Sequence, residues 1–208
     1  CTKDEQMAKL KLQAEVISAL EGAELQDFST AQRAVVSTLK SGQNKWLIAA
    51  DLAPLRIAVA ATIIHKLKAS FEDVARALIL VQNSEIADEY ARHFETLGKH
   101  TDLRVWTAYP GPQLLKLKED IYFGADVVIA TPKRLNELLN IEGFNSAAVQ
   151  TLVLDASYQL LKVGNIAFTQ RISDSIPLKQ RVALSTENKG STAAYMDRFA
   201  FPFSVEEY

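Results

Sequence analysis

The sequence has little cysteine, and Cys1 is its only thiol, so no disulfide bond can form within the chain. Proteins built without disulfides are typical of a reducing compartment, and we expect a cytoplasmic protein. The sequence also has no apolar run close to the roughly 20 residues that a membrane helix requires, so we expect no association with a membrane. A formal net charge of −2 provides no overall attraction to nucleic acid, so such binding would need a local basic surface.

Signals for metal sites and for covalent catalysis are absent as well. His65, His93 and His100 fall on separate segments, with no acid or cysteine at the spacing of metal ligands. The sequence contains no Gly-x-Ser-x-Gly turn and no candidate cysteine nucleophile. We therefore assign no metal ligand and no catalytic residue.

Short apolar runs are present, and they alternate with segments of helical periodicity. With 208 residues, of which 48% are hydrophobic, the chain is long enough for one sizeable core, and we expect a single domain over 1–208. Within it, 1–44 carries N-terminal helices and 45–208 carries the sheet. The strands that we expect are 46–50, 77–81, 103–108, 127–131, 152–155 and 182–185, with the tail at 201–203 as a further candidate.

Between these runs the spacing of apolar residues predicts helices. A first helix is expected over 3–20, a second from about 29 to 42, and the others at 55–67, 85–97, 112–121, 132–139, 166–176 and 192–199. Strands that alternate with helices are typical of right-handed βαβ units. The predicted fold is therefore α/β, a three-layer α/β/α sandwich with a mostly parallel sheet.

The run Thr-Leu-Val-Leu-Asp at 151–155 predicts a buried strand that ends on an acid. Open α/β sheets place their ligand sites at the carboxyl ends of their strands, so Asp155 is a candidate site residue. An acid in this place can also cap the following helix. Ala156, Ser157 and Tyr158 carry no charge, so the site has a single carboxylate.

Several short strings occur in the order and spacing of one family. They are Phe-Ser-Thr-Ala-Gln at 28–32, the loop 49–56 after the first strand, Thr-Pro-Lys-Arg at 131–134, and Val-Leu-Asp-Ala-Ser-Tyr at 153–158. In these strings the chain resembles the first RecA-like domain of DEAD-box RNA helicases, over nearly its whole length. The resemblance implies a P-loop NTPase-like fold, ATP and magnesium as cofactors, an adenine contact from Gln32 and a metal contact from Asp155.

The phosphate loop departs from this resemblance. The segment 49–56 reads Ala-Ala-Asp-Leu-Ala-Pro-Leu-Arg, with no glycine, and Arg56 stands where the family has a hydroxyl. Glycines let backbone N–H groups curl around phosphate, so we expect ATP binding to be lost, with Leu52, Pro54 and Leu55 filling the space and Arg56 meeting at most an anion. Ala156 also replaces the glutamate that positions water in the family. The expectation is a pseudoenzyme that needs no cofactor.

The loops that face RNA in the family are better preserved. Gln-Asn-Ser-Glu at 82–85, Tyr-Pro-Gly at 109–111 and the 131–134 string resemble them. Such loops contact the sugar-phosphate chain without reading bases. The RNA-binding candidates are Asn83, Glu85, Gly111, Thr131 and Arg134, although a threonine followed by proline is also ordinary chemistry for a helix start.

Three functions stay open at this point. The first is a helicase-like domain without ATP hydrolysis that acts as a protein-interaction or regulatory module in RNA metabolism, with a protein or a second RecA-like domain as partner. The second is a weak, sequence-independent binder of single-stranded RNA. The third is a residual ATPase that uses Gln32, Arg56 and Asp155. We favour the first, because the net charge of −2 and the missing arginine beside Glu85 weaken backbone contacts.

Overall fold

The structure, a computed structural model, describes residues 3–177 and 179–208. Its centre is a parallel sheet of seven strands in the order β3-β4-β2-β5-β6-β1-β7. The strands are β1 Lys45–Ile48, β2 Ala77–Leu80, β3 Val105–Ala108, β4 Val127–Ala130, β5 Thr151–Leu154, β6 Gln180–Ser185 and β7 Ser204–Glu207. The six strands predicted from apolar runs are present, and the tail adds β7, slightly later than expected, as an edge strand beside β1.

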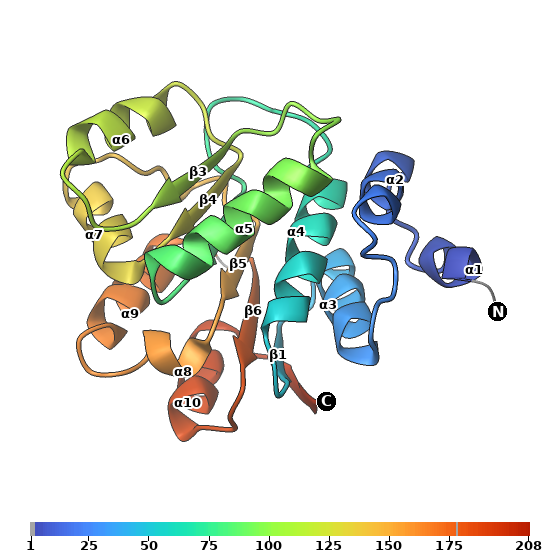
Figure 1. Cartoon of the computed structure of the whole chain (residues 1–208). Coiled ribbons are helices and arrows are strands. Elements are labelled where there is room, and N and C mark those ends of the chain that lie inside the picture. Colours follow the sequence, from blue (N-terminus) through green and yellow to red (C-terminus); the bar gives the residue numbers. More distant parts are fainter. Residues whose placement is uncertain (1–2, 178) are drawn as a thin grey trace.

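Helices cover both faces of this sheet (Figure 1). One face carries α2 Ala14–Gly22, α3 Thr30–Ser41, α4 Ala53–Leu67 and α5 Ser84–Leu97, with α1 Lys3–Ala8 beyond them. The other face carries α6 Leu114–Tyr122, α7 Pro132–Asn140, α8 Ser157–Leu160, α9 Ile166–Ser175 and α10 Gly190–Phe199. The predicted three-layer sandwich is confirmed. None of the described helices combines the length and the apolar character needed to cross a membrane.

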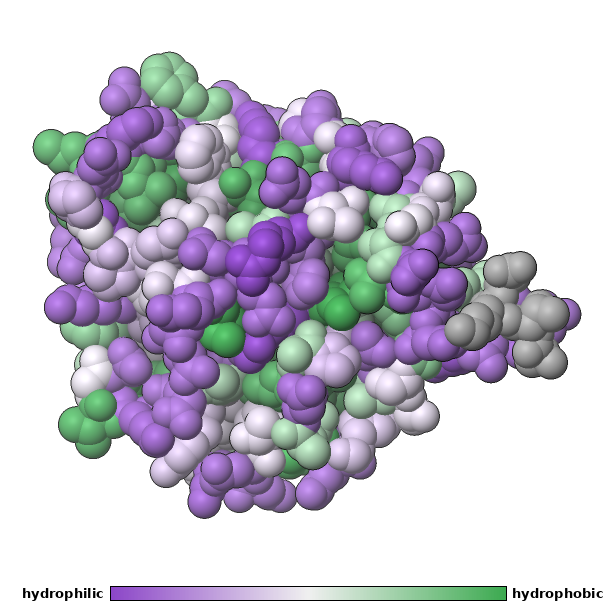
Figure 2. Space-filling model, viewed as in Figure 1, coloured by the Kyte–Doolittle hydropathy of each residue, from purple (hydrophilic) through white to green (hydrophobic). Residues whose placement is uncertain are grey.

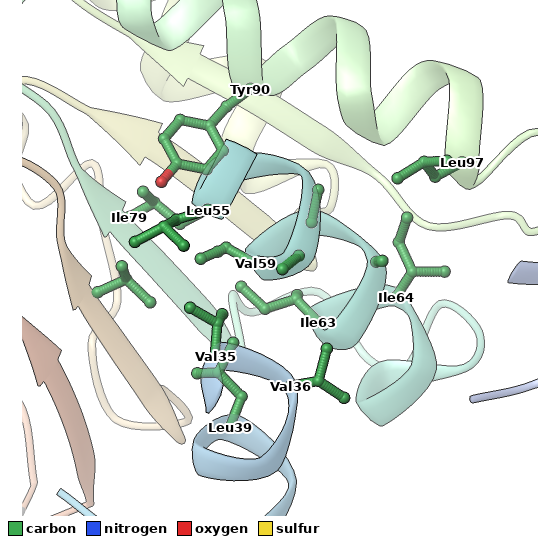
Figure 3. Close-up of a cluster of buried hydrophobic side chains, with 14 of the residues drawn as sticks. Val35, Val36, Leu39, Leu55, Val59, Ile63, Ile64, Ile79, Tyr90 and Leu97 are labelled. Carbon is green, nitrogen blue, oxygen red and sulfur yellow. The ribbon is translucent and has the colours of Figure 1, made fainter. Parts of the chain in front are cut away.

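The central strands contribute side chains to two hydrophobic cores. Leu47, Ile79 and Val153 belong to the core under α3, α4 and α5, and their sequence neighbours Leu78 and Leu154 belong to the core on the opposite face. Side chains alternate across a strand, so a strand buried on both faces must be apolar at every position. Figure 3 shows the first core, where α3 and α4 pack side chains such as Val35, Val36, Ile63 and Ile64 against one another.

The single N-terminal helix predicted over 3–20 is wrong, because the chain breaks between α1 and α2. Lys11 adopts a positive φ of 51° in this break. The Lys40 ammonium donates to the carbonyls of Leu10 and Lys11, and the Gln13 N–H donates to His65 Nδ1. These partners lie far away in the sequence and stabilise the break, so the local periodicity could not reveal it.

At the amino ends of the strands, one buried carboxylate holds three loops together. Asp126, which is fully buried, accepts hydrogen bonds from the backbone N–H groups of Phe71 and Arg104 and from the guanidinium groups of Arg76 and Arg104. Burial alone would raise the pKa of Asp126, but the hydrogen bonds from Arg104, Arg76 and Phe71 lower it overall. These loops precede β2, β3 and β4, so Asp126 aligns the starts of three adjacent strands.

Replacing Gly124 with alanine is expected to destabilise this end of the sheet. Gly124 has a φ of +135°, and a Cβ there would overlap the Arg104 guanidinium, which Asp126 and Asp73 hold in place. We expect a loss of about 1–3 kcal/mol in the free energy of unfolding, measured by urea denaturation. Gly190→Ala is the matched control, because a Cβ at Gly190 meets nothing within 4 Å. Equal stability of the two variants would contradict the argument.

Candidate functional site

Asp155 lies at the carboxyl end of β5, in the middle of the sheet. Its backbone N–H donates to the Leu80 carbonyl of the neighbouring strand β2 at 2.9 Å, which continues the ladder one residue beyond β5. The side chain is completely buried. A buried carboxylate requires charged or hydrogen-bonding partners, because the desolvation free energy of an unpaired charge is larger than the total stability of a typical domain.

Arg56, in the first turns of α4, is that partner. Its Nε donates to Asp155 Oδ2 at 2.9 Å and its Nη2 donates to Asp155 Oδ1 at 3.0 Å, which is a two-point ion pair. The remaining Nη1 donates to Glu89 Oε2 of α5 at 3.0 Å. The hydroxyl of Tyr90 completes the arrangement by donating to Asp155 Oδ2 at 2.6 Å.

The groups of this cluster fix one another's protonation states. Burial alone would lower the pKa of Arg56, but its hydrogen bonds with Asp155 and the negative charges of Asp155 and Glu89 raise it overall. Burial and the charge of Asp155 raise the pKa of the Tyr90 hydroxyl well above its ordinary value. Arg56 therefore stays charged and Tyr90 stays neutral, each as a hydrogen-bond donor to Asp155.

A cavity of about 230 Å³ lies next to this cluster. Its lining comes from the loop after β1, from the α4 start, from the loops after β2 and β5, and from the end of β6: Ala50, Asp51, Leu52, Arg56, Gln82, Ala156, Tyr158, Gln159, Ser185 and Thr186. The expectation that apolar side chains of the loop fill this space is wrong. Leu52 and Leu55 are buried in the core under α4, and the space beside the loop stays open.

The residues present do not fit a magnesium nucleotide in this arrangement. Both oxygens of Asp155 are engaged by Arg56, and Oδ2 also accepts from Tyr90, so neither faces the cavity as a free metal ligand. Across the described residues, no group of three or more His, Cys, Asp or Glu side chains is close enough to hold a metal ion. The guanidinium of Arg56 supplies, from within the protein, the positive charge that this carboxylate needs.

Gln32 has structural partners on both sides of its amide. Its Oε1 accepts from the Ser29 N–H at 2.8 Å and its backbone N–H donates to the Ser29 hydroxyl, which forms a capping box at the start of α3. Its Nε2 donates to the Pro54 carbonyl at 2.9 Å. Gln32 therefore ties α3 to the start of α4, and its side chain is buried.

The five RNA-binding candidates lie on the other half of the same sheet edge. Asn83 follows β2 and caps α5 by accepting from the Ile86 N–H at 2.9 Å, while Glu85 in the first turn of α5 is exposed. Arg134 in α7 is buried, and its Nη2 donates to the Gly111 carbonyl at 2.9 Å.

Thr131 occupies the N-cap position just before α7 but makes no capping hydrogen bond, and its buried hydroxyl has no hydrogen-bond partner in the described structure. The structure thus brings Gly111, Thr131 and Arg134 together beside β3 and β4, because the Thr131 N–H also donates to the Ala108 carbonyl at 3.0 Å. Asp155 and Arg56 lie apart from them at β5, two strands away from β4.

Sequence reasoning missed Tyr90 and Glu89. Both belong to α5, whose apolar face packs on the sheet, and their pairing with Arg56 and Asp155 spans up to 65 residues of sequence. One signal was available. Arg56 falls among apolar residues of α4, and an arginine on a buried helix face requires acidic partners from another element.

Comparison with known proteins identifies the family to which the fold and the motifs belong. The family model described as DEAD/DEAH box helicase matches residues 56–186, which is more than half of the chain. The chain belongs to this family. Relatives include "DEAD-box ATP-dependent RNA helicase 9" of Oryza sativa subsp. japonica, 28% identical over 86% of this chain and 29% of the relative. "ATP-dependent RNA helicase SrmB" of Escherichia coli (strain K12) is 35% identical over 43% of this chain and 20% of its own length.

A solved structure supports the fold of this DEAD-box domain. The crystal structure of a DEAD box protein from the hyperthermophile Methanococcus jannaschii matches with a TM-score of 0.90, at 18% identity, over 97% of this chain and 55% of that one. The resemblance to the N-terminal RecA-like domain is confirmed. The chain spans about half of that structure and less than a third of the two relatives above.

The expectation that the chain is not an enzyme is contradicted. Its relatives are named as ATP-dependent RNA helicases, which are enzymes, and the family model matches residues 56–186, a region that includes Ala156. The loop without glycine and Ala156 describe changes in the residues. Changed residues do not by themselves show lost activity, so the prediction of a pseudoenzyme went beyond the substitutions on which it rested.

Proposed function

We propose that this chain is a DEAD-box helicase domain of RNA metabolism that acts mainly through protein contacts, as a regulatory or docking domain for another protein or for a second RecA-like domain. The observation that supports this is the two-point ion pair between Arg56 and Asp155. The two side chains neutralise each other at the centre of the candidate site, so the isolated domain does not need bound ATP and magnesium to neutralise the Asp155 carboxylate.

The cost to nucleotide affinity can be bounded. The loop lacks three contacts of the family type, namely the glycine-rich backbone cradle, the lysine and the hydroxyl. At about 1.5–3 kcal/mol for each charge-assisted contact, their loss lowers the affinity for ATP by about a thousandfold or more. We propose that ATP binds weakly to this domain by itself.

Binding of single-stranded RNA is the second candidate function. The relatives are named RNA helicases, and the unpartnered hydroxyl of Thr131 at the start of α7 favours it. Against it, Arg134 is buried, and its two Nη atoms already donate to the Gly111 carbonyl and to Glu137. The RNA-facing loops therefore have few free donors for phosphate, and RNA contacts are secondary in this proposal.

Titration of the domain into fluorescein-labelled oligo-uridine, at low and at moderate salt, separates the two candidates. We expect weak binding at low salt that disappears at moderate salt, because backbone contacts from few cations are strongly screened. Addition of ATP and magnesium should leave the curves unchanged.

Saturable binding at moderate salt would contradict the proposal, provided that Thr131→Val weakens it. This variant removes the hydroxyl and keeps the shape of the side chain. In that case RNA binding is the principal function. A response to ATP and magnesium that Gln32→Ala abolishes, while the variant keeps the unfolding midpoint of the parent, would show instead that Gln32 reads adenine.

A further inference from the structure

Four large apolar side chains are exposed along α6 and on the segments next to its C-terminal end. We call Phe71, Leu115, Tyr122 and Phe123 the α6 patch, with exposed fractions of 61%, 74%, 77% and 71%. Leu115 and Tyr122 are two helical turns apart and so project from the same side of α6. Figure 2 shows hydrophobic atoms at the surface in the upper left of the molecule, where Figure 1 places α6.

Phe71 comes from a different loop, and contacts of a single arginine bring it beside α6. The Arg104 guanidinium donates to the Glu72 carbonyl and packs against Gly124, so the loop around Phe71 and the residues after α6 share one neighbour. The rings of Tyr122 and Phe123 meet edge to face at a centroid distance of 5.8 Å. Asp126 accepts from the Phe71 N–H and from Arg104, so these two residues hold the loop around Phe71 next to the segment that follows α6.

A cavity of about 210 Å³ opens beside the patch. Its walls come from the loop before β2, from α6 and from the loop after α7, and they are Asp73, Val74, Ala75, Lys118, Ile121, Tyr122, Glu142, Gly143, Phe144 and Asn145. Most of these walls are apolar side chains or backbone. The cavity is large enough for one aliphatic or aromatic side chain, which is the form that an anchor residue of a protein interface takes.

The charges around the cavity are unbalanced. In the part of the chain that the structure describes, the carboxylates of Glu72, Glu119 and Glu142 are exposed and have neither an ion pair nor a side-chain hydrogen bond. Of the cations on α6, Lys116 pairs with Asp120, and Lys118 donates to the neutral Ile141 carbonyl, which leaves one positive charge beside three unpaired carboxylates. The rim of the cavity is thus acidic around an apolar centre.

We propose that the α6 patch and its cavity bind a basic segment of a partner protein, with one aliphatic or aromatic side chain in the cavity and Lys or Arg residues beside Glu72, Glu119 and Glu142. This deepens the proposed docking function and rests on it. A second copy of this chain is the less suitable occupant, because it would bring the same unpaired carboxylates against their own kind. Two opposite charges on the rim favour association, whereas two like charges oppose it.

Selection of random short peptides displayed on phage against the immobilised domain tests this surface. We expect the enriched peptides to carry net positive charge and at least one large apolar residue. A fluorescein-labelled copy of the most enriched peptide should then bind more weakly as salt is raised. Its affinity should fall at least about tenfold in Tyr122→Ser, which removes an aromatic wall of the cavity.

Two further variants separate charge from fold. The double variant Glu119→Lys/Glu142→Lys should also lose affinity while keeping the circular dichroism spectrum and unfolding midpoint of the parent. Val163→Ser is the matched control, because Val163 is 99% exposed and lies outside the α6 patch, and it should leave peptide binding unchanged.

The possible results distinguish the surface from the general function. Enriched peptides that are neutral or acidic, or that bind Tyr122→Ser as well as the parent, overturn the assignment of this surface and leave protein docking elsewhere intact. A dimer of the parent chain that Tyr122→Lys dissociates in sedimentation also overturns it, by showing a second copy in this place. Failure to enrich any peptide, combined with tight oligo-uridine binding, overturns the docking function itself.

Discussion

Asp155→Ala is expected to lower the free energy of unfolding by about 3–5 kcal/mol, because it leaves the Arg56 guanidinium buried against Glu89 alone. Tyr90 would also lose the acceptor of its hydroxyl, which lies 2.6 Å from Asp155 Oδ2. For a domain whose total stability is about 5–15 kcal/mol, this is a large share. Urea denaturation followed by tryptophan fluorescence measures it, since Trp46 is buried in the core.

A double-mutant cycle assigns the loss to the ion pair. Arg56→Met should be destabilising by a similar amount, and the double variant Arg56→Met/Asp155→Ala should cost less than the sum of the two single variants by about 1–3 kcal/mol. Asp197→Ala provides the control, because Asp197 is an exposed acid on α10. Additive effects of the two substitutions, or an Asp155→Ala variant as stable as Asp197→Ala, would show that the ion pair does not stabilise the fold.

Asp126→Ala should have an effect of similar size at the opposite edge of the sheet. Asp126 Oδ1 accepts from the Phe71 N–H and from Arg76 Nη2, and Oδ2 accepts from the backbone and side chain of Arg104. Its removal leaves two buried or half-buried guanidinium groups without their main acceptor, at a cost of about 3–5 kcal/mol. Because Asp126 also orders the loop that carries Phe71, peptide binding at the α6 patch should weaken in parallel.

The same carboxylate makes stability depend on pH. The folded-state pKa of Asp126 is lowered, since its hydrogen bonds from Arg104, Arg76 and Phe71 outweigh the opposing effect of burial. The unfolded chain therefore binds the proton more readily, and the stabilisation is complete above the unfolded pKa of about 3.9 and is lost as the pH falls through the folded value. Asp126→Asn should show a shallower loss of stability between about pH 5 and pH 2 than the parent. Identical acid profiles would contradict this.

Much of the fold could be predicted because its determinants are local. The six apolar runs mark strands, since a parallel sheet covered on both faces needs apolar residues on both. Where partners far along the chain decide the structure, prediction failed. Lys40 and His65 stabilise the break before α2, and the one-turn helix α8 is too short to show a period. The edge position of β7 depends on pairing with β1 and not on its own sequence, Ser-Val-Glu-Glu.

The sequence drew attention to two positions of the candidate site but not to the arrangement that joins them. Arg56 and Asp155 were both identified from motif positions, one as a possible anion contact and one as a former metal ligand. Their direct pairing across 99 residues, and the support from Tyr90 and Glu89, depend on the packing of α4 and α5 on the sheet. Motif comparison locates a position along the chain, but it does not reveal that the altered residue Arg56 pairs with the retained residue Asp155.

The Arg56–Asp155 pair also constrains how this sequence can change over generations. A neutral residue at 56 leaves the Asp155 carboxylate buried without its ion pair, and a neutral residue at 155 does the same to the Arg56 guanidinium. Each single replacement therefore gives an evolutionary intermediate of low stability. Descendants can leave this arrangement only if both positions change nearly together or if stability is gained elsewhere first. The two residues should therefore covary, and their covariation across the immediate lineage would record when the positive charge of Arg56 entered the site.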